Sequence, residues 1–120
     1  MRAQTEKAVR EWQHTCAAEI AATVLAGAWK PVIMHELREA GVLRFRELAR
    51  RTGGLSERGL TRQLRELEED GLVARQVYPQ VPPKVEYRLT EVGEEAQEVL
   101  DVMARWGRGY AARFGPGEPS

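Results

Sequence analysis

The chain has 120 residues, of which 42% are hydrophobic and 30% are charged, so it can form a folded core and is not a disordered chain. Its 18 basic and 18 acidic side chains cancel, which at first argues against a nucleic-acid partner, and its single cysteine excludes an internal disulfide and a cysteine-based zinc site. The longest uncharged stretch, 20–29, is too short to span a bilayer, and the charged first residues do not form a signal peptide. We expect a cytoplasmic protein with one domain.

The first helical segment is expected over about 4–26, because residues 4–26 contain no glycine or proline. Apolar or small residues recur there every four positions, which lines one face of a helix. They are Ala8, Trp12, Cys16, Ile20 and Val24. The segment is either one long helix or two helices with a break near Thr15.

Another helix is expected from about Lys30 to Gly41. Pro31 fits the first turn of a helix, and a glycine often follows the last turn. Val32, Ile33 and Leu37 would form the apolar side of this helix.

Residues 44–71 have the pattern of a helix-turn-helix. A short amphipathic helix over 44–51 is followed by two glycines, and Ser56 is a good N-cap for the next helix. That helix would bury Leu60, Leu64 and Leu67 and end at Gly71. Short helices joined by a tight, glycine-containing turn are typical of this motif.

Residues 73–89 change from a helical to a strand pattern. Positions 73, 75 and 77 share one face of an extended chain, as do the apolar positions 85, 87 and 89 around two charged residues, which predicts two half-buried strands. The loop between them, 78–84, contains three prolines, which cannot donate hydrogen bonds to a strand ladder. A two-stranded hairpin directly after a helix-turn-helix is a wing.

A long helix is expected over about 91–113, with Thr90 placed to cap it. Its apolar stripe consists of Val92, Ala96, Val99, Met103, Trp106 and Tyr110. Residues 115–120, rich in glycine and proline, are expected to form a flexible tail. The sequence therefore predicts a mainly α-helical (α+β) fold over 1–114, in which terminal helices flank a helix-turn-helix and a small β-hairpin.

The charges are unevenly distributed. Residues 44–65 carry seven arginines and two glutamates, a balance of +5, whereas residues 91–101 carry five acids and no base. The basic segment coincides with the helix-turn-helix, whose geometry suits the major groove of DNA, and the arginine fork matches phosphate and the edge of guanine. The alternative is a solvated, arginine-rich helix face.

Two segments resemble HxlR-type winged helix-turn-helix transcription regulators, which belong to the MarR-like winged-helix proteins. The segment SERGLTRQLRELEEDGLV, 56–73, is similar to the recognition helix of that family, and YPQVPPKVEYRLT, 78–90, is similar to its wing. The resemblance extends from about Cys16 to about Tyr110. It implies prokaryotic homodimers that bind inverted-repeat operators, and some members sense electrophiles or oxidants through a cysteine near the N-terminus.

The polar face of the helix after Ser56 supplies the main DNA-binding candidates. Because the first turn of a recognition helix reaches base edges, we expect Arg58, Thr61 and Arg62 to read bases. Arg65 either contacts phosphate or pairs with a glutamate one turn away, at position 68 or 69. Ser56 is also a candidate DNA contact, although its capping role explains it better.

Further DNA contacts are expected from the wing and from the first helix of the motif. Lys84 would meet phosphate or the minor groove, and Gln80 is a second wing candidate. Arg44, Arg46 and Arg51 either contact the DNA backbone or remain solvated.

The terminal helices are expected to form a homodimer, because a winged-helix core is too small to bury both of their apolar stripes. The interface would contain Val9, Trp12, Val99, Met103, Trp106 and Tyr110. A two-fold dimer would place two recognition helices about 34 Å apart, one turn of DNA, and would require a palindromic operator. The alternative is that the two helices cover each other within one chain.

Cys16 is a candidate thiol sensor, but the sequence around it favours a structural role. Family members commonly have proline after this cysteine, whereas this chain has Ala17, so a helix could continue through the cysteine and bury its thiol. We therefore expect diamide to leave DNA affinity unchanged. A second departure lies at 26–29, Ala-Gly-Ala-Trp, where the family often has Gly-Gly-Lys-Trp.

Other chemistry finds little support. The two histidines, His14 and His35, have no metal-motif spacing, and no catalytic or phosphate-binding motif is present. We expect no enzyme activity, metal, cofactor or membrane partner; the expected partners are double-stranded DNA and a second copy. The alternatives are a winged helix that docks a protein, and a regulator gated by Cys16 oxidation or by a small aromatic effector. The effector cavity would be lined by Trp12, Trp29, Met103 and Trp106.

Overall fold

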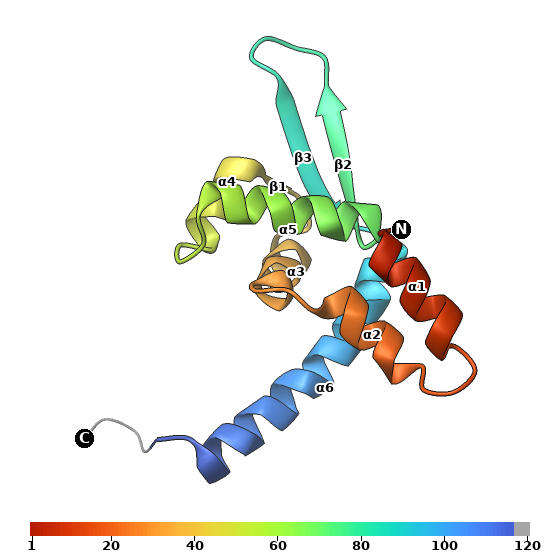
Figure 1. The fold of residues 1–120 in the computed structure, drawn as a ribbon. Helices are drawn as coiled ribbons and strands as arrows, with labels where there is room; N and C mark the ends of the chain where they lie inside the picture. The colour runs from red at the N-terminus through yellow and green to blue at the C-terminus, as the bar shows by residue number, and fades with distance from the viewer. Residues whose placement is uncertain (117–120) are drawn as a thin grey trace.

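The computed structural model describes residues 1–116, which form six helices and three strands (Figure 1). The elements are α1 (Ala3–Trp12), α2 (Ala18–Leu25), α3 (Lys30–Ala40), β1 (Leu43–Arg44), α4 (Phe45–Arg51), α5 (Glu57–Glu69), β2 (Val73–Tyr78), β3 (Lys84–Leu89) and α6 (Glu91–Phe114). The tail predicted at 115–120 lies outside the described residues from 117 onward.

The predicted mainly helical fold with a small hairpin is confirmed, but the hairpin belongs to a larger sheet. The strand order is β1-β3-β2, and both pairs are antiparallel. In the hairpin Val73 pairs with Leu89 and Tyr78 with Lys84, while Leu43 of β1 pairs with Tyr87. The sequence pattern missed β1 because two residues are too few to show an alternation.

The hydrophobic core lies between α3, α4, α5 and the base of the sheet. Its fully buried side chains come from each of these helices, and they include Ile33, Met34, Leu37, Leu48, Leu60, Leu64 and Leu67. Val32, predicted on the apolar side of α3, is exposed instead, because Met34 takes its place on the buried side. The core fixes α5 against α3, so the polar face of α5 is turned outward.

The N-terminal segment is two helices rather than one. Residues 13–17 form a turn, which confirms the alternative with a break near Thr15, and α1 folds back to pack on α2. The turn allows Thr5 and Ala8 of α1 to be buried. A single helix would carry α1 away from the chain and expose both side chains.

The last helix, α6, is packed at its start and uncovered along its second half. Gly93 lies so close to the carbonyl of Leu72 that a side chain at position 93 would collide with it. Gln97 and Leu100 are also buried, whereas every residue from Asp101 to Phe114 is exposed. Figure 1 shows this half running away from the rest of the chain. Accordingly the radius of gyration is 16.1 Å, against roughly 13–14 Å for a compact domain of this length.

Candidate nucleic-acid interface

Local interactions fix the start of α5. The hydroxyl of Ser56 accepts a hydrogen bond from the backbone N–H of Gly59 at 3.0 Å, which confirms the predicted N-cap. Glu57 adds a negative charge in the first turn, where the helix dipole favours it. These features set the first turn of α5 at the outer surface, next to the turn from α4.

The outward face of α5 is basic. Arg58, Thr61, Arg62 and Arg65 are all exposed, on the side opposite the buried leucines. Within residues 1–116 none of these three arginines has a carboxylate within 4.0 Å, so the alternative pairing of Arg65 with a nearby glutamate is not formed. The hydroxyl of Thr61 donates to the carbonyl of Glu57 at 2.9 Å, which leaves the hydroxyl oxygen able to accept.

The arginines before the turn differ in their surroundings. Arg44 and Arg46 are exposed, and the backbone N–H of Arg44 donates to Glu47 Oε1 at 2.9 Å, which fixes the start of α4. Arg51 instead pairs with Glu36 of α3 at 3.2 Å. Of these candidates, Arg51 is therefore the one whose charge is already partly balanced.

A groove separates α5 from the wing, with a volume of about 530 Å³. It is lined by Thr61, Leu64, Arg65, Glu68, Glu69, Arg75 and Tyr87. Burial raises the pKa of the Tyr87 phenol, so the hydroxyl stays protonated at neutral pH and can donate. Arg75 lies opposite Tyr87 in the hairpin register, and its Nε is 3.4 Å from Glu68.

Arg75 and Tyr87 are not among the DNA-binding residues predicted from the sequence, although both line this groove. A usable signal was present, because the strand alternation that predicted the hairpin already placed Arg75 on one face with Val73 and Val77. The alternation does not reveal the pairing register of β2 and β3. That register sets Arg75 beside Tyr87, and both residues line the groove next to α5.

The wing tip projects far from the helices (Figure 1). Val81 is fully exposed there, and Gln80 is exposed beside it. Lys84, at the start of β3, lies over the Tyr78 ring at 4.7 Å and 3.7 Å from Glu86, so its amine is held near the wing surface. Glu86 partly balances the charge of this amine, which is held at a defined place on the wing.

The candidate dimer residues lie at the surface. Trp12, Val99, Met103, Trp106 and Tyr110 are exposed and Val9 is half-buried. Trp106 stacks on Tyr110, with ring centroids 5.3 Å apart, and Tyr110 packs against Phe114. An apolar groove of about 360 Å³ between α2 and α6 continues this surface; Ile20, Val24, Val92, Ala96 and Val99 are part of its lining.

The expectation of a buried Cys16 is wrong. Cys16 is exposed, in the turn two residues before α2 begins. The four-residue spacing of apolar residues suggested one continuous face, but the chain reverses direction at the turn. Ala17 does not prevent this turn, although it lacks the proline that commonly starts a helix there.

The four residues suggested for an aromatic effector cavity do not come together. Trp29 packs against the core and lies over Gly54, whereas Trp12 is exposed on α1. Met103 and Trp106 line two different surface hollows. The described residues thus offer no common cavity for these side chains.

Residues 1–116 contain neither a metal-binding cluster nor a membrane-spanning helix. His14 and His35 are exposed, and no group of three or more histidine, cysteine, aspartate or glutamate side chains is arranged to hold a metal ion in this part of the chain. The same residues contain no helix with the length and apolar character needed to cross a membrane.

A helix-turn-helix with an exposed basic helix and an adjoining β-hairpin defines a winged helix-turn-helix protein. The HxlR-like helix-turn-helix family matches residues 24–114, and the chain belongs to that family. It is a DNA-binding transcriptional regulator of the helix-turn-helix type, not an enzyme. The resemblance found in the recognition helix and wing is thereby confirmed.

Individual relatives agree with this assignment. An HTH-type transcriptional regulator of Methanothermobacter thermautotrophicus is 44% identical over 100 residues, covering 83% of this chain and 76% of the relative. The reduced form of the redox regulator HypR is 43% identical, with a TM-score of 0.71 over 78% of this chain and 91% of that one. The reduced transcriptional regulator YodB from B. subtilis is 35% identical, with a TM-score of 0.67 over 88% and 96% of the two chains.

Proposed function

We propose that the protein acts as a homodimer on a palindromic operator, with α5 in the major groove and the wing on the backbone or in the minor groove. One observation carries this proposal: α5 buries its leucines in the core and exposes Arg58 and Arg62, which have no carboxylate partner within residues 1–116. Unpaired arginines in the first turns of such a helix suit phosphates and guanine edges.

The groove between α5 and the wing supports the same binding mode. Arg65 and Arg75 lie on its two sides and would hold one DNA strand between them, with phosphate displacing Glu68 from Arg75. Lys84 would add a contact from the wing. Arg44 and Arg46 would contact the backbone on the other side of the helix-turn-helix.

The uncovered half of α6 supports the dimer. Trp106, Tyr110 and Phe114 form one continuous aromatic surface, and large exposed apolar patches mark interaction sites. A second copy would cover this surface, since two-fold homodimers are the commonest closed assemblies. The dimer also supplies the second recognition helix that a palindrome requires.

Operator binding is tested with duplexes selected by the protein from a randomised library. Arg62→Ala is expected to weaken binding by about 1–3 kcal/mol and to relax one operator position, because a base contact is lost. Arg10→Ala removes an exposed arginine from α1 and serves as the matched control. An unchanged footprint and affinity for Arg62→Ala would remove this residue from the interface.

The salt dependence of binding separates this proposal from a winged helix that docks a protein. Several phosphate contacts make affinity fall steeply with salt concentration. A protein that selects no duplex, or binds one without salt dependence, would contradict the operator proposal. Sedimentation at micromolar concentration tests the dimer, and a monomer there would count against it.

A second proposal concerns Cys16, because its thiol is exposed and the redox regulator HypR is among the relatives. With one cysteine per chain, diamide can join two Cys16 thiols of different subunits in a disulfide, taking up the two hydrogens, or give a mixed adduct with a small thiol. Because the thiol is exposed, the expected result is a change in operator affinity that dithiothreitol reverses, in place of the unchanged affinity expected for a buried thiol. Cys16→Ser should abolish the change, and an equal response in that variant would exclude the thiol.

A further inference from the structure

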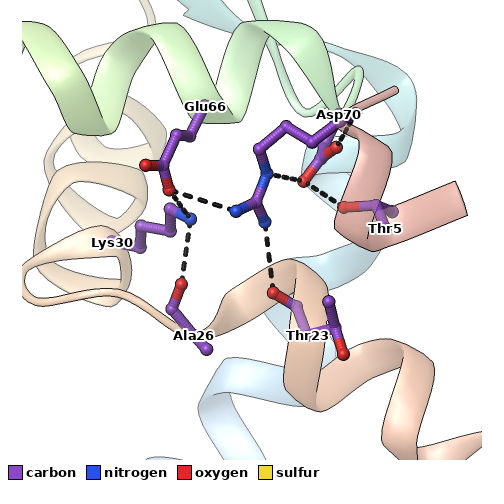
Figure 2. A network of polar contacts seen from close by, with 7 residues as sticks. Thr5, Thr23, Ala26, Lys30, Glu66 and Asp70 are labelled. Atoms are coloured by element: carbon purple, nitrogen blue, oxygen red, sulfur yellow. Dashed lines mark hydrogen bonds and ion pairs between the residues drawn. The ribbon is translucent and has the colours of Figure 1, made fainter. Parts of the chain in front are cut away.

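A buried charged cluster joins the first residues of the chain to the far end of α5 (Figure 2). The backbone N–H and the Nε of Arg2 donate to the two carboxylate oxygens of Asp70, at 2.9 and 2.7 Å. Arg2 Nη1 and Lys30 Nζ both donate to Glu66 Oε1, at 3.2 and 2.8 Å. We call Arg2, Lys30, Glu66 and Asp70 the charged joint.

The joint is shielded from water. Lys30 is 0% exposed, Arg2 is 8% exposed and the Asp70 side chain is 1% exposed, while Glu66 keeps 28%. Buried ion pairs add little net stability over apolar residues of similar volume, but their directional hydrogen bonds fix one arrangement of the parts they connect. We therefore expect the joint to fix the relative orientation of the segments it connects more than to raise the stability of the fold.

The same two cations also hold the end of α2. Arg2 Nη2 donates to the carbonyl of Thr23 at 3.1 Å, and Lys30 Nζ donates to the carbonyl of Ala26 at 2.9 Å. Positive charge is favourable at the C-terminal end of a helix, where carbonyls have no partner within the helix. The joint thus connects α1, α2, the start of α3 and α5 at one point (Figure 2).

The charged joint supplies the polar connection between α1 and α5. Helix α1 packs mainly on α2, and within residues 1–116 its hydrogen bonds to the end of α5 come from Arg2 and from Thr5, whose hydroxyl donates to Asp70 at 2.9 Å. The outer end of α1 carries Val9 and Trp12, which are candidate dimer residues. The joint therefore links the proposed dimer surface to the recognition helix.

We propose that Arg2 is a positioning residue for operator recognition, which fixes the angle between α1 and α5 and thereby the separation of the two recognition helices in the dimer. The inference rests on the proposed function, since it requires the dimer. Helix α1 is about 15 Å long, so a tilt of about 15° at the joint moves its outer end by about 4 Å. That distance is close to the rise of one base pair, about 3.4 Å.

The test compares operator duplexes in which one or two base pairs are inserted or removed between the half-sites selected by the wild-type protein. Arg2→Gln is expected to reduce the discrimination between the best and the altered spacings by about fivefold or more, while affinity for a single half-site stays unchanged. Arg2→Lys keeps the positive charge but lacks the planar, multiply donating guanidinium, so its discrimination between spacings should lie between those of the wild type and Arg2→Gln.

The control variant is Lys7→Gln, which removes an exposed ion pair with Glu11 on the same helix. It should leave the spacing preference unchanged. If Arg2→Gln lowers thermal stability and weakens binding to all duplexes in proportion, Arg2 is only structural and the inference is overturned. Circular dichroism shows whether each variant is folded. If Arg2→Gln is unfolded, the spacing preference of Arg2→Lys is used for the test instead.

A measurement without DNA separates this inference from operator binding. In a Cys16→Ser background, Glu57→Cys carries a spin label at the exposed start of α5. Pulsed electron paramagnetic resonance should give one narrow distance distribution across the wild-type dimer and a broader one for Arg2→Gln. Equal widths would overturn the inference even if DNA binds, whereas failure to bind DNA with a clear broadening would overturn only the operator proposal. A monomer would overturn the dimer and this inference together.

Discussion

Helices α5 and α6 are both amphipathic, yet α5 buries its apolar face within the chain whereas α6 buries only the first part of its own. The three leucines of α5 are buried, whereas Trp106 and Tyr110 of α6 are 70% and 53% exposed. The side that α5 leaves outside is basic, and the side that α6 leaves outside is aromatic. The basic surface of α5 favours an anionic partner, and the aromatic surface of α6 favours an apolar partner.

Helix α6 also differs along its own length. Its first turns are anchored by Gly93 and Leu100 against the core, and they carry the acidic cluster of 91–101. Its second half leaves the core and carries the aromatic surface. Like-charge repulsion from this acidic half disfavours DNA there, so we expect a DNA partner and a protein partner to use separate faces.

The largest expected effect concerns the covered face of α5. Leu60→Ala should lower the free energy of unfolding by about 2–5 kcal/mol, because it leaves a cavity in a packed core. Chemical denaturation measures this change. Val102→Ala on the exposed side of α6 is the matched control and should change stability by no more than about 0.5 kcal/mol. Equal losses in the two variants would contradict the contrast between the helices.

The next effect concerns the uncovered face of α6. Trp106→Ala should weaken the dimer by about 2 kcal/mol or more, roughly 30-fold in its dissociation constant, because buried tryptophans dominate interface energetics. Sedimentation equilibrium measures the constant. Arg105→Ala, at a neighbouring exposed position, should have little effect. A dimer that tolerates Trp106→Ala would place the interface elsewhere.

A smaller effect is expected where the two helices are alike. Ser56 and Thr90 cap α5 and α6 by accepting a hydrogen bond from Gly59 and Gly93. Replacing either cap by alanine should cost about 1 kcal/mol in the free energy of unfolding. Thermal or chemical unfolding of the single variants measures the loss, and no loss for Ser56→Ala would show that the start of α5 is held by the core alone.

Acid below about pH 4 should produce the smallest change. The hydrogen bond from Lys30 lowers the pKa of Glu66; for Asp70, burial acts to raise the pKa, but the bonds from Arg2 and Thr5 outweigh it and the pKa is lowered. Carboxylates with a lowered pKa stabilise the fold above their unfolded pKa, near 4, and this contribution disappears as the pH falls through their folded pKa. Denaturation from pH 7 to 3 measures this loss, which should be smaller in Asp70→Asn. An identical pH profile in that variant would show that Asp70 does not contribute.

Local patterns were sufficient where neighbouring residues decide the structure. The caps, the leucine spacing and the hairpin alternation predicted α5, the wing and α6 nearly to their observed ends. The same spacing failed at Cys16, because a four-residue repeat cannot show that the chain reverses direction between two helices. It failed at β1 as well, since that strand exists only by pairing with β3.

The sequence by itself determined the class of the protein, because the charge distribution, the turn glycines and the wing motif are all local features. Only the tertiary structure decided which distant residues contact each other and which side chains stay exposed. It brought Arg2 to Asp70 across 68 positions, set Tyr87 beside Arg75, exposed Cys16, and left the aromatic half of α6 without cover. These are contacts between residues far apart in the chain, and they follow from packing a common core rather than from any pattern within one segment.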